Sequence, residues 1–118
     1  MRRLQLVNPV GLVGRFVVIR LGDKYHEDLS PGEEVALIGA DDKPVGYAKA
    51  ADCWVGDLAL IPGSLLEMDQ NPLHRTYSGL IMGLRGQLAL AGEPTDLEPS
   101  AKVTALILDF TRASLVKV

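Results

Sequence analysis

A buried strand is predicted most clearly by the residues Gly14-Arg15-Phe16-Val17-Val18-Ile19-Arg20-Leu21. Its centre is an unbroken apolar run rich in β-branched residues, which is typical of a strand that is covered on both faces. Arg20 ends this run, and residues 22–28 that follow are mostly polar, so they cannot belong to a core. The chain therefore leaves a buried strand directly into an exposed loop.

Two more strands are predicted downstream of this loop. Residues 30–33 (Ser-Pro-Gly-Glu) have the composition of a turn, because proline presets φ and glycine permits a positive φ. A second strand is expected over residues 34–39, followed by a turn over 40–44 and a third strand over 45–55. The third strand has small residues on both faces, which suits a tightly curved barrel strand. We expect the second and third strands to form a hairpin.

A helical block is predicted for the middle of the chain. Residues 57–61 fit either a short helical turn capped by its first residue or an extended segment. Ser64-Leu65-Leu66-Glu67 matches a capping box, and Asn71-Pro72 predicts a second helix start. Apolar residues then recur at helical spacing up to a plausible stop at Gly86. These residues are Leu73, Tyr77, Leu80, Ile81 and Leu84.

The C-terminal part returns to extended structure. A short strand is expected over residues 88–91, and residues 92–100 are expected to form a loop with two prolines. Residues 102–110 predict the last clear strand, because apolar side chains alternate along them. The tail over residues 111–118 is expected to add an edge strand beside residues 4–7.

Composition places the chain among ordinary globular domains. It has 118 residues, of which 47% are hydrophobic and 23% charged, so we expect one domain with its own core. The net charge of −3 argues against broad, charge-driven binding to nucleic acid. Cys53 is the only cysteine, which excludes an intramolecular disulfide and a cysteine-rich metal site. We expect it to be a small buried hydrophobe.

Targeting and cofactor motifs are absent from the sequence. Two arginines open the chain, but no long apolar segment follows them, and no apolar run approaches the ~18 residues needed to span a membrane. We therefore expect a cytoplasmic protein that makes no membrane contact. Because no phosphate-binding loop, nucleophile elbow or zinc motif is present, we expect neither a cofactor nor a metal ion.

The order of these elements resembles that of the ASCH domain, a member of the PUA-like superfamily. The resemblance rests on a strand that ends in Arg20, the turn Pro31-Gly32-Glu33, Gly46 entering the second strand of a pair, an inserted helical block, and a final strand that ends Ile107-Leu108-Asp109-Phe110. It covers residues 14–110.

This resemblance implies an α+β fold. We expect a PUA-like bent β-barrel of about five to six mostly antiparallel strands, with the helical block inserted, as a single domain over residues 1–118.

The resemblance also implies a binding module that recognises RNA or a nucleotide-like ligand in a cleft beside the barrel. An arginine fork can hold a phosphate or a base edge, a lysine can meet a phosphate, and aromatic rings can stack on a base. The candidate ligand-binding residues are Arg15, Arg20, Lys24, Tyr25, Trp54 and Glu67. The other polar residues of the insert, His74 and Arg75, are expected at the surface.

An alternative is an amidohydrolase that acts on a modified nucleoside. One branch of small bacterial ASCH proteins hydrolyses acetylated cytidine with a lysine, a threonine and a glutamate. The corresponding positions here are Arg15, Val18, and a site near Glu67 or Asp69. Valine has no hydroxyl and arginine stays protonated, so we do not expect hydrolysis by that mechanism, and we assign no catalytic residue.

A third alternative is a structural or interaction domain, of the kind found in phages and mobile elements, whose pocket has been lost. The apolar tail, with Leu115, Val116 and Val118, is the kind of edge that invites pairing. A homodimer is therefore left open.

Overall fold

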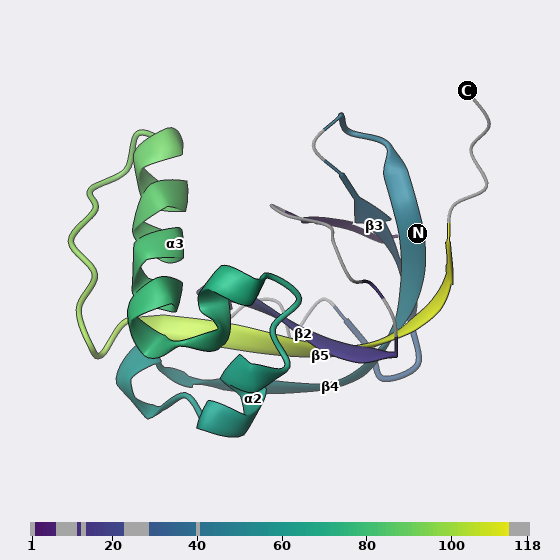
Figure 1. Cartoon of the computed structure of the whole chain (residues 1–118), viewed down its shortest axis with the longest axis horizontal. Coiled ribbons are helices and arrows are strands. Elements are labelled where there is room, and N and C mark those ends of the chain that lie inside the picture. The colour runs from purple at the N-terminus through teal and green to yellow at the C-terminus, as the bar shows by residue number, and fades with distance from the viewer. Residues whose placement is uncertain (1, 7–11, 13, 23–28, 40, 114–118) are drawn as a thin grey trace.

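The fold is built on one five-stranded mixed sheet with the strand order β1-β3-β4-β5-β2 (Figure 1). The computed structural model describes residues 2–6, 12, 14–22, 29–39 and 41–113. The strands are β1 (Arg2–Gln5), β2 (Arg15–Leu21), β3 (Glu34–Ile38), β4 (Pro44–Asp57) and β5 (Lys102–Ala113). The helices are the 3₁₀ turns η1 (Leu58–Leu60) and η2 (Pro72–Arg75) and the α-helices α2 (Gly63–Glu67) and α3 (Tyr77–Leu90).

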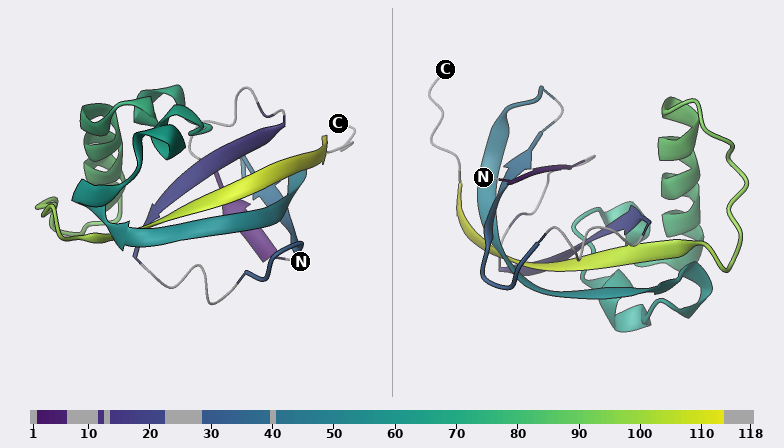
Figure 2. Two further views of the ribbon diagram at one scale, coloured as in Figure 1. Left: turned by 90° about the horizontal axis from the view of Figure 1, so that it is seen from below. Right: turned by 180° about the vertical axis from the view of Figure 1, so that it is seen from behind.

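A sharp bend in β4 and β5 divides this sheet into two parts. The pairing of the two strands shifts register between Tyr47 and Ala48 and again between Ala50 and Asp52. Such bulges bend a strand and increase its twist. The first half of β4 therefore turns away with β3 and β1, while the second half stays beside β5 and β2 (Figures 1 and 2). This confirms the predicted hairpin of β3 and β4 and the curvature of the third predicted strand.

The predicted barrel is corrected to an open sheet. Strand β1 pairs in parallel with β3, and within the described residues no backbone ladder joins β1 to β2. The free edge of β2 is instead occupied by the helical insert. The Val17 amide donates to the Met68 carbonyl at 2.8 Å, and the Gln70 amide donates to the Val17 carbonyl at 2.8 Å. A closing strand would need these same backbone groups.

Arg20 spans the gap between the two edges of the sheet. Its guanidinium donates to the carbonyl oxygen of Ile19 at 3.1 Å and to that of Gln5, the last residue of β1. The opposed edges are thus tied by a side chain rather than by a ladder.

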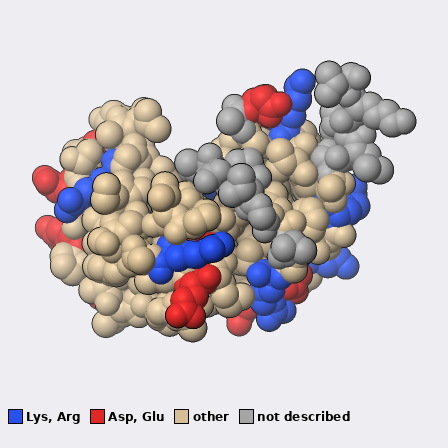
Figure 3. Space-filling model, in the orientation of Figure 1, with Lys and Arg blue, Asp and Glu red and all other residues tan. Residues whose placement is uncertain are grey.

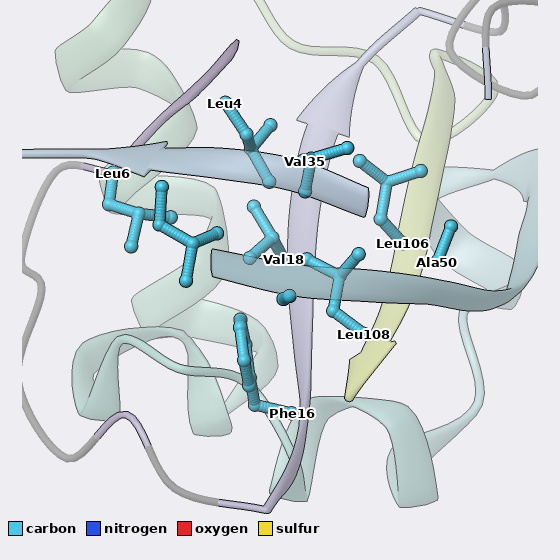
Figure 4. Close-up of a cluster of buried hydrophobic side chains, with 10 residues drawn as sticks. Leu4, Leu6, Phe16, Val18, Val35, Ala50, Leu106 and Leu108 are labelled. Carbon is cyan, nitrogen blue, oxygen red and sulfur yellow. The ribbon is translucent and has the colours of Figure 1, made fainter. Parts of the chain in front are cut away.

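Two apolar clusters form the core. We call the first the inner cluster; its buried members converge in Figure 4 and are Leu4, Leu6, Phe16, Val18, Val35, Leu37, Ala48, Ala50, Leu106 and Leu108. We call the second the helix-side cluster; it joins the opposite side chains of β2 and β5 to the insert and contains Val17, Ile19, Leu58, Ile61, Leu66, Leu80, Leu84, Val103 and Ala105. The helices accordingly gather on the β2 side of the sheet (Figure 2, left).

The insert starts differently from the predicted capping box. Helix α2 begins at Gly63 after Pro62, and no side chain caps it. Ser64 lies within the helix rather than before it, so it cannot bond the first free amides. Residues 58–60 form a 3₁₀ turn, and the Asp57 carboxylate pairs with Lys102 instead of capping it.

Helix α3 begins later and ends later than predicted. Asn71 caps only the short turn η2, and the α-helix starts after Thr76, whose hydroxyl accepts from the Gly79 amide at 3.1 Å. The helix continues past Gly86 to Leu90, so the predicted short strand over 88–91 is wrong. Within the described chain, no helix combines the length and apolar character needed to cross a membrane.

The predicted edge strand at the C-terminus is also corrected in part. Residues 111–113 extend β5 along β4, where Arg112 pairs with Tyr47, rather than lying beside residues 4–7. Residues 114–118 lie outside the described part of the chain.

Two glycines of α3 differ in the space around them, which makes them a matched pair. A methyl group at Gly83 would overlap the His74 imidazole, whereas one at Gly86 would meet no atom within 4 Å. We expect Gly83→Ala to lower the free energy of unfolding by about 1–3 kcal/mol through overpacking. Gly86→Ala should raise it by up to about 1 kcal/mol, because alanine favours the helix. Urea denaturation of both variants measures this, and equal shifts would contradict the packing of η2 on α3.

Removal of the Arg20 side chain should loosen the sheet. We expect Arg20→Ala to lower the free energy of unfolding by about 1–2 kcal/mol, because the Gln5 carbonyl then loses its charged hydrogen-bond donor. Amide hydrogen exchange should quicken in β1. The control is Arg15→Ala on the same strand, which removes an exposed ion pair and should cost less. Unchanged exchange in β1 would show that Arg20 does not hold the two edges together.

Candidate functional site

The predicted ligand-binding residues do not converge in one place. Phe16, Val18 and Arg20 are every second residue of β2, so Arg20 lies on the same inner face as the two buried residues. Trp54 instead packs against the helix-side cluster. Glu67 is exposed at the end of α2. Lys24 and Tyr25 lie outside the described residues. Whether any of these side chains contacts a ligand stays a prediction.

Arg15 is engaged with an acid from the far end of the chain. Its guanidinium donates to both oxygens of Asp109, at 2.8 and 3.0 Å. These hydrogen bonds lower the pKa of the Asp109 carboxyl and raise the pKa of Arg15. The planar fork of this arginine is thus already bound to a carboxylate.

The positions that correspond to an acetylcytidine hydrolase are also separated. Val18 is buried in the inner cluster, and Arg15 projects to the other face of β2 into solvent. Asp69 is buried in the insert, and Glu67 is exposed. These four residues therefore supply no nucleophile beside a base.

A pocket of about 230 Å³ opens on the inner face of the bent sheet. We call it the inner pocket; its lining residues are Leu29, Pro31, Ala50, Asp52, Cys53, Leu106 and Leu108. The buried side chains of Ala50, Leu106 and Leu108 belong to the inner cluster (Figure 4), whereas Pro31 and Asp52 are exposed. An apolar core surface is thus reachable from solvent. Sequence reasoning missed this pocket because the bulge in β4 and the return of the chain at Leu29 create it.

Cys53 contributes a thiol to the wall of the inner pocket. Burial raises the pKa of its thiol, and the negative charge of Asp52 raises it further. The Asp52 carboxylate also accepts a hydrogen bond from the backbone amide of Cys53 at 2.8 Å. The thiol is therefore protonated near neutral pH, and it contributes to the wall as a small apolar group.

A group of buried polar side chains lies in the insert, where the sequence predicted surface. His74 is only 4% exposed, Asp69 2% and Asn71 6%, so the expected surface position of His74 is wrong. One carboxylate oxygen of Asp69 accepts a hydrogen bond from the backbone amide of Asn71 at 2.8 Å, and the other lies 3.4 Å from Nδ1 of His74. Thr76 and the turn η2 reverse the chain here, and Gly83 leaves room for the imidazole. A helix predicted straight through from Asn71 could not show this burial.

Five basic side chains of the described residues form ion pairs with acidic ones. The ion pairs of the described residues join Arg2 to Glu33, Arg3 to Asp42, Arg15 to Asp109, Lys102 to Asp57 and Arg112 to Glu34. On the face shown in Figure 3, basic and acidic side chains lie side by side. This surface does not form the continuous basic stripe that tracks a nucleic-acid backbone.

Comparison with known proteins shows the fold. No protein-family model and no curated protein matches the sequence. The structure is similar to protein EF3133 from Enterococcus faecalis V583, of the family DUF984, with a TM-score of 0.63, 10% identity, and coverage of 85% of this chain. It is also similar to an ASCH domain from Lactobacillus crispatus JV V101, with a TM-score of 0.60, 8% identity, and coverage of 82%. The chain has an ASCH-type fold.

The resemblance found in the sequence is thereby confirmed at the level of the fold. The aligned part spans 63% of the length of the Enterococcus protein and 64% of that of the Lactobacillus domain. The ASCH-type fold here carries an open sheet, because the insert bonds the edge of β2.

The raised pKa of Cys53 has a measurable consequence. Alkylation by iodoacetamide should be slower than that of a free cysteine at pH 8, and its rate should rise at a higher pH, since only the thiolate reacts. Asp52→Asn removes one of the two causes and should speed the reaction. Rates over a pH series measure this, with urea-unfolded protein as the control. A profile that coincides in the folded and unfolded protein would contradict the burial of Cys53.

Proposed function

We propose that the chain is a cytoplasmic RNA- or nucleotide-binding module that holds one base or nucleotide-like ligand in the inner pocket. The observation that carries this proposal is an apolar pocket of about 230 Å³, open to solvent on the inner face of an ASCH-type fold. Ligand sites are typically concave and mostly apolar, and this pocket is smaller than the roughly 300 Å³ at which their usual range of volumes begins. It suits a single ring rather than a large molecule.

The chemistry of the lining supports a flat ligand. The faces of a base are apolar, and they can lie against the pocket wall to which Ala50, Leu106 and Leu108 contribute. Leu29, which lines the pocket, follows residues 23–28 in the sequence, and these include Lys24 and Tyr25. In this proposal Tyr25 stacks on the bound ring and Lys24 meets a phosphate. Arg20 lies on the same face of the sheet and bonds the Gln5 carbonyl of β1. Substitution of Arg20 would therefore also break this contact between β1 and β2.

Electrostatics favour recognition of one nucleotide over tracking of a long backbone. Affinity for nucleic acid falls with salt in proportion to the number of phosphates that are neutralised. Here the net charge is −3, and carboxylates pair with Arg2, Arg3, Arg15 and Arg112. The proposal therefore implies weak salt dependence.

A titration of ¹⁵N-labelled protein tests this function. The ligands are the four ribonucleosides, N4-acetylcytidine, the matching 5′-monophosphates and a short single-stranded RNA. We expect amide shifts at Ala50, Leu106 and Leu108, tighter binding of monophosphates than of nucleosides, and affinities that change little with salt.

Two substitutions at one position provide the matched control. Cys53→Leu fills the inner pocket and should weaken binding at least about tenfold, as a blocked apolar site loses its contacts. Cys53→Ala leaves the pocket open and should bind as the natural chain does. No shifts at millimolar ligand would overturn the proposal and favour an interaction domain, for which sedimentation would show self-association. Equal binding by both variants would place the ligand elsewhere.

A further inference from the structure

A second pocket, of about 300 Å³, lies between the turn η2 and the helix α3. We call it the insert pocket; its lining residues are Asn71, Leu73, His74, Gly79, Met82, Gly83 and Gln87. None of them lines the inner pocket, so this site does not depend on the proposed function.

Two glycines let η2 approach α3 closely enough to form this pocket. A methyl group on Gly79 would overlap the Leu73 carbonyl oxygen, and one on Gly83 would overlap the His74 imidazole. The turn η2 therefore packs directly on the α3 backbone at these two glycines, and side chains form most of the pocket lining. Leu73 and Met82 are 71% and 73% exposed, although both are large and apolar. They present a hydrophobic rim to solvent.

The polar wall of the insert pocket is fixed from behind. The Asn71 side chain accepts the Leu73 amide at 3.1 Å, and its amide nitrogen lies 3.5 Å from Nε2 of His74. Nδ1 of the same ring faces Asp69 at 3.4 Å. The imidazole is thus held between Asn71 and Asp69, with one ring nitrogen facing each of these side chains. Buried polar groups held in this way give a preorganised wall.

Gln87 supplies an unused hydrogen-bonding group on the opposite wall. It is half-buried on α3, and its side-chain amide bonds to none of the described residues. A carboxamide offers one acceptor and two donors. It can therefore exchange two parallel hydrogen bonds with another amide edge.

The lining also selects against charge. The described lining residues include no aspartate, glutamate, lysine or arginine. A charged ligand would lose its hydration here without gaining a partner of opposite charge. A neutral ligand that is apolar apart from one amide edge would keep its hydrogen bonds and bury its body.

From these observations we propose that the insert pocket binds a small neutral molecule. Its carboxamide or lactam edge meets Gln87, and its flat apolar body lies against the exposed side chains of Leu73 and Met82.

Benzamide and benzoate are matched probes of this proposal, because they share a ring and differ in charge. The readout is the ¹³C-methyl signal of Met82, with Met68, which packs against the helix-side cluster, as the internal control. We expect millimolar benzamide to shift Met82 and not Met68. Benzoate should bind at least about tenfold more weakly, because its carboxylate would be desolvated without a partner.

Variants on α3 separate this site from general surface binding. Gln87→Leu should weaken benzamide binding about three- to tenfold by removal of the amide partner. Gln87→Glu keeps the side-chain shape and should also weaken benzamide binding. This variant provides the test if Gln87→Leu does not fold. Leu90→Ala, on the same helix and 92% exposed, should leave binding unchanged.

Three outcomes would overturn the proposal. These are an unshifted Met82, equal binding of benzamide and benzoate, and unchanged binding in both Gln87 variants. Cys53→Leu, which fills the inner pocket, should leave the Met82 shift intact. Loss of the Met82 shift in that variant would show that benzamide binding depends on the inner pocket, and this would also overturn the proposal. Because the two pockets share no lining residue, the result of the nucleoside titration does not decide the result with benzamide.

Discussion

The backbone hydrogen bonds between the edge of β2 and the helical insert are the contacts on which the rest of the structure depends. Both backbone groups of Val17 are bonded to the segment around Asp69, at 2.8 Å each. Unpaired backbone groups at a sheet edge must find partners when they are buried. Because the insert supplies them, it is docked at a defined place, its apolar side chains cover one face of the sheet, and the sheet stays open.

The bend in β4 and β5 provides the second constraint. One bulge near Ala48 and another near Ala51 let the same two strands serve both halves of the sheet. The inner cluster gathers side chains from both parts of the bent sheet (Figure 4), and the helix-side cluster joins β2 and β5 to the insert. Three residues of the inner cluster, Ala50, Leu106 and Leu108, also line the inner pocket. The insert pocket arises differently, from glycines that let a turn lie against a helix.

The distribution of charge bears on how an ASCH-type fold can be used here. Carboxylates bind Arg2, Arg3, Arg15 and Arg112 on the surface, and both pockets are mostly apolar. Recognition in such pockets depends on shape and on a few hydrogen bonds rather than on long-range attraction. A fold shared with other proteins does not choose among ligands, so the lining residues carry the functional argument.

The sequence by itself determined the strands over residues 14–21, 34–39, 45–55 and 102–110, because β-branched runs, alternation and turn residues act over a few positions. It also indicated the ASCH-type order of elements and the presence of a helical insert. Only the tertiary structure decided that the sheet is open, that His74 is buried, and that Arg15 is bound by Asp109, which is 94 residues away. Local preference cannot show these outcomes. Each depends on which other segment of the folded chain packs against a given backbone edge or side chain.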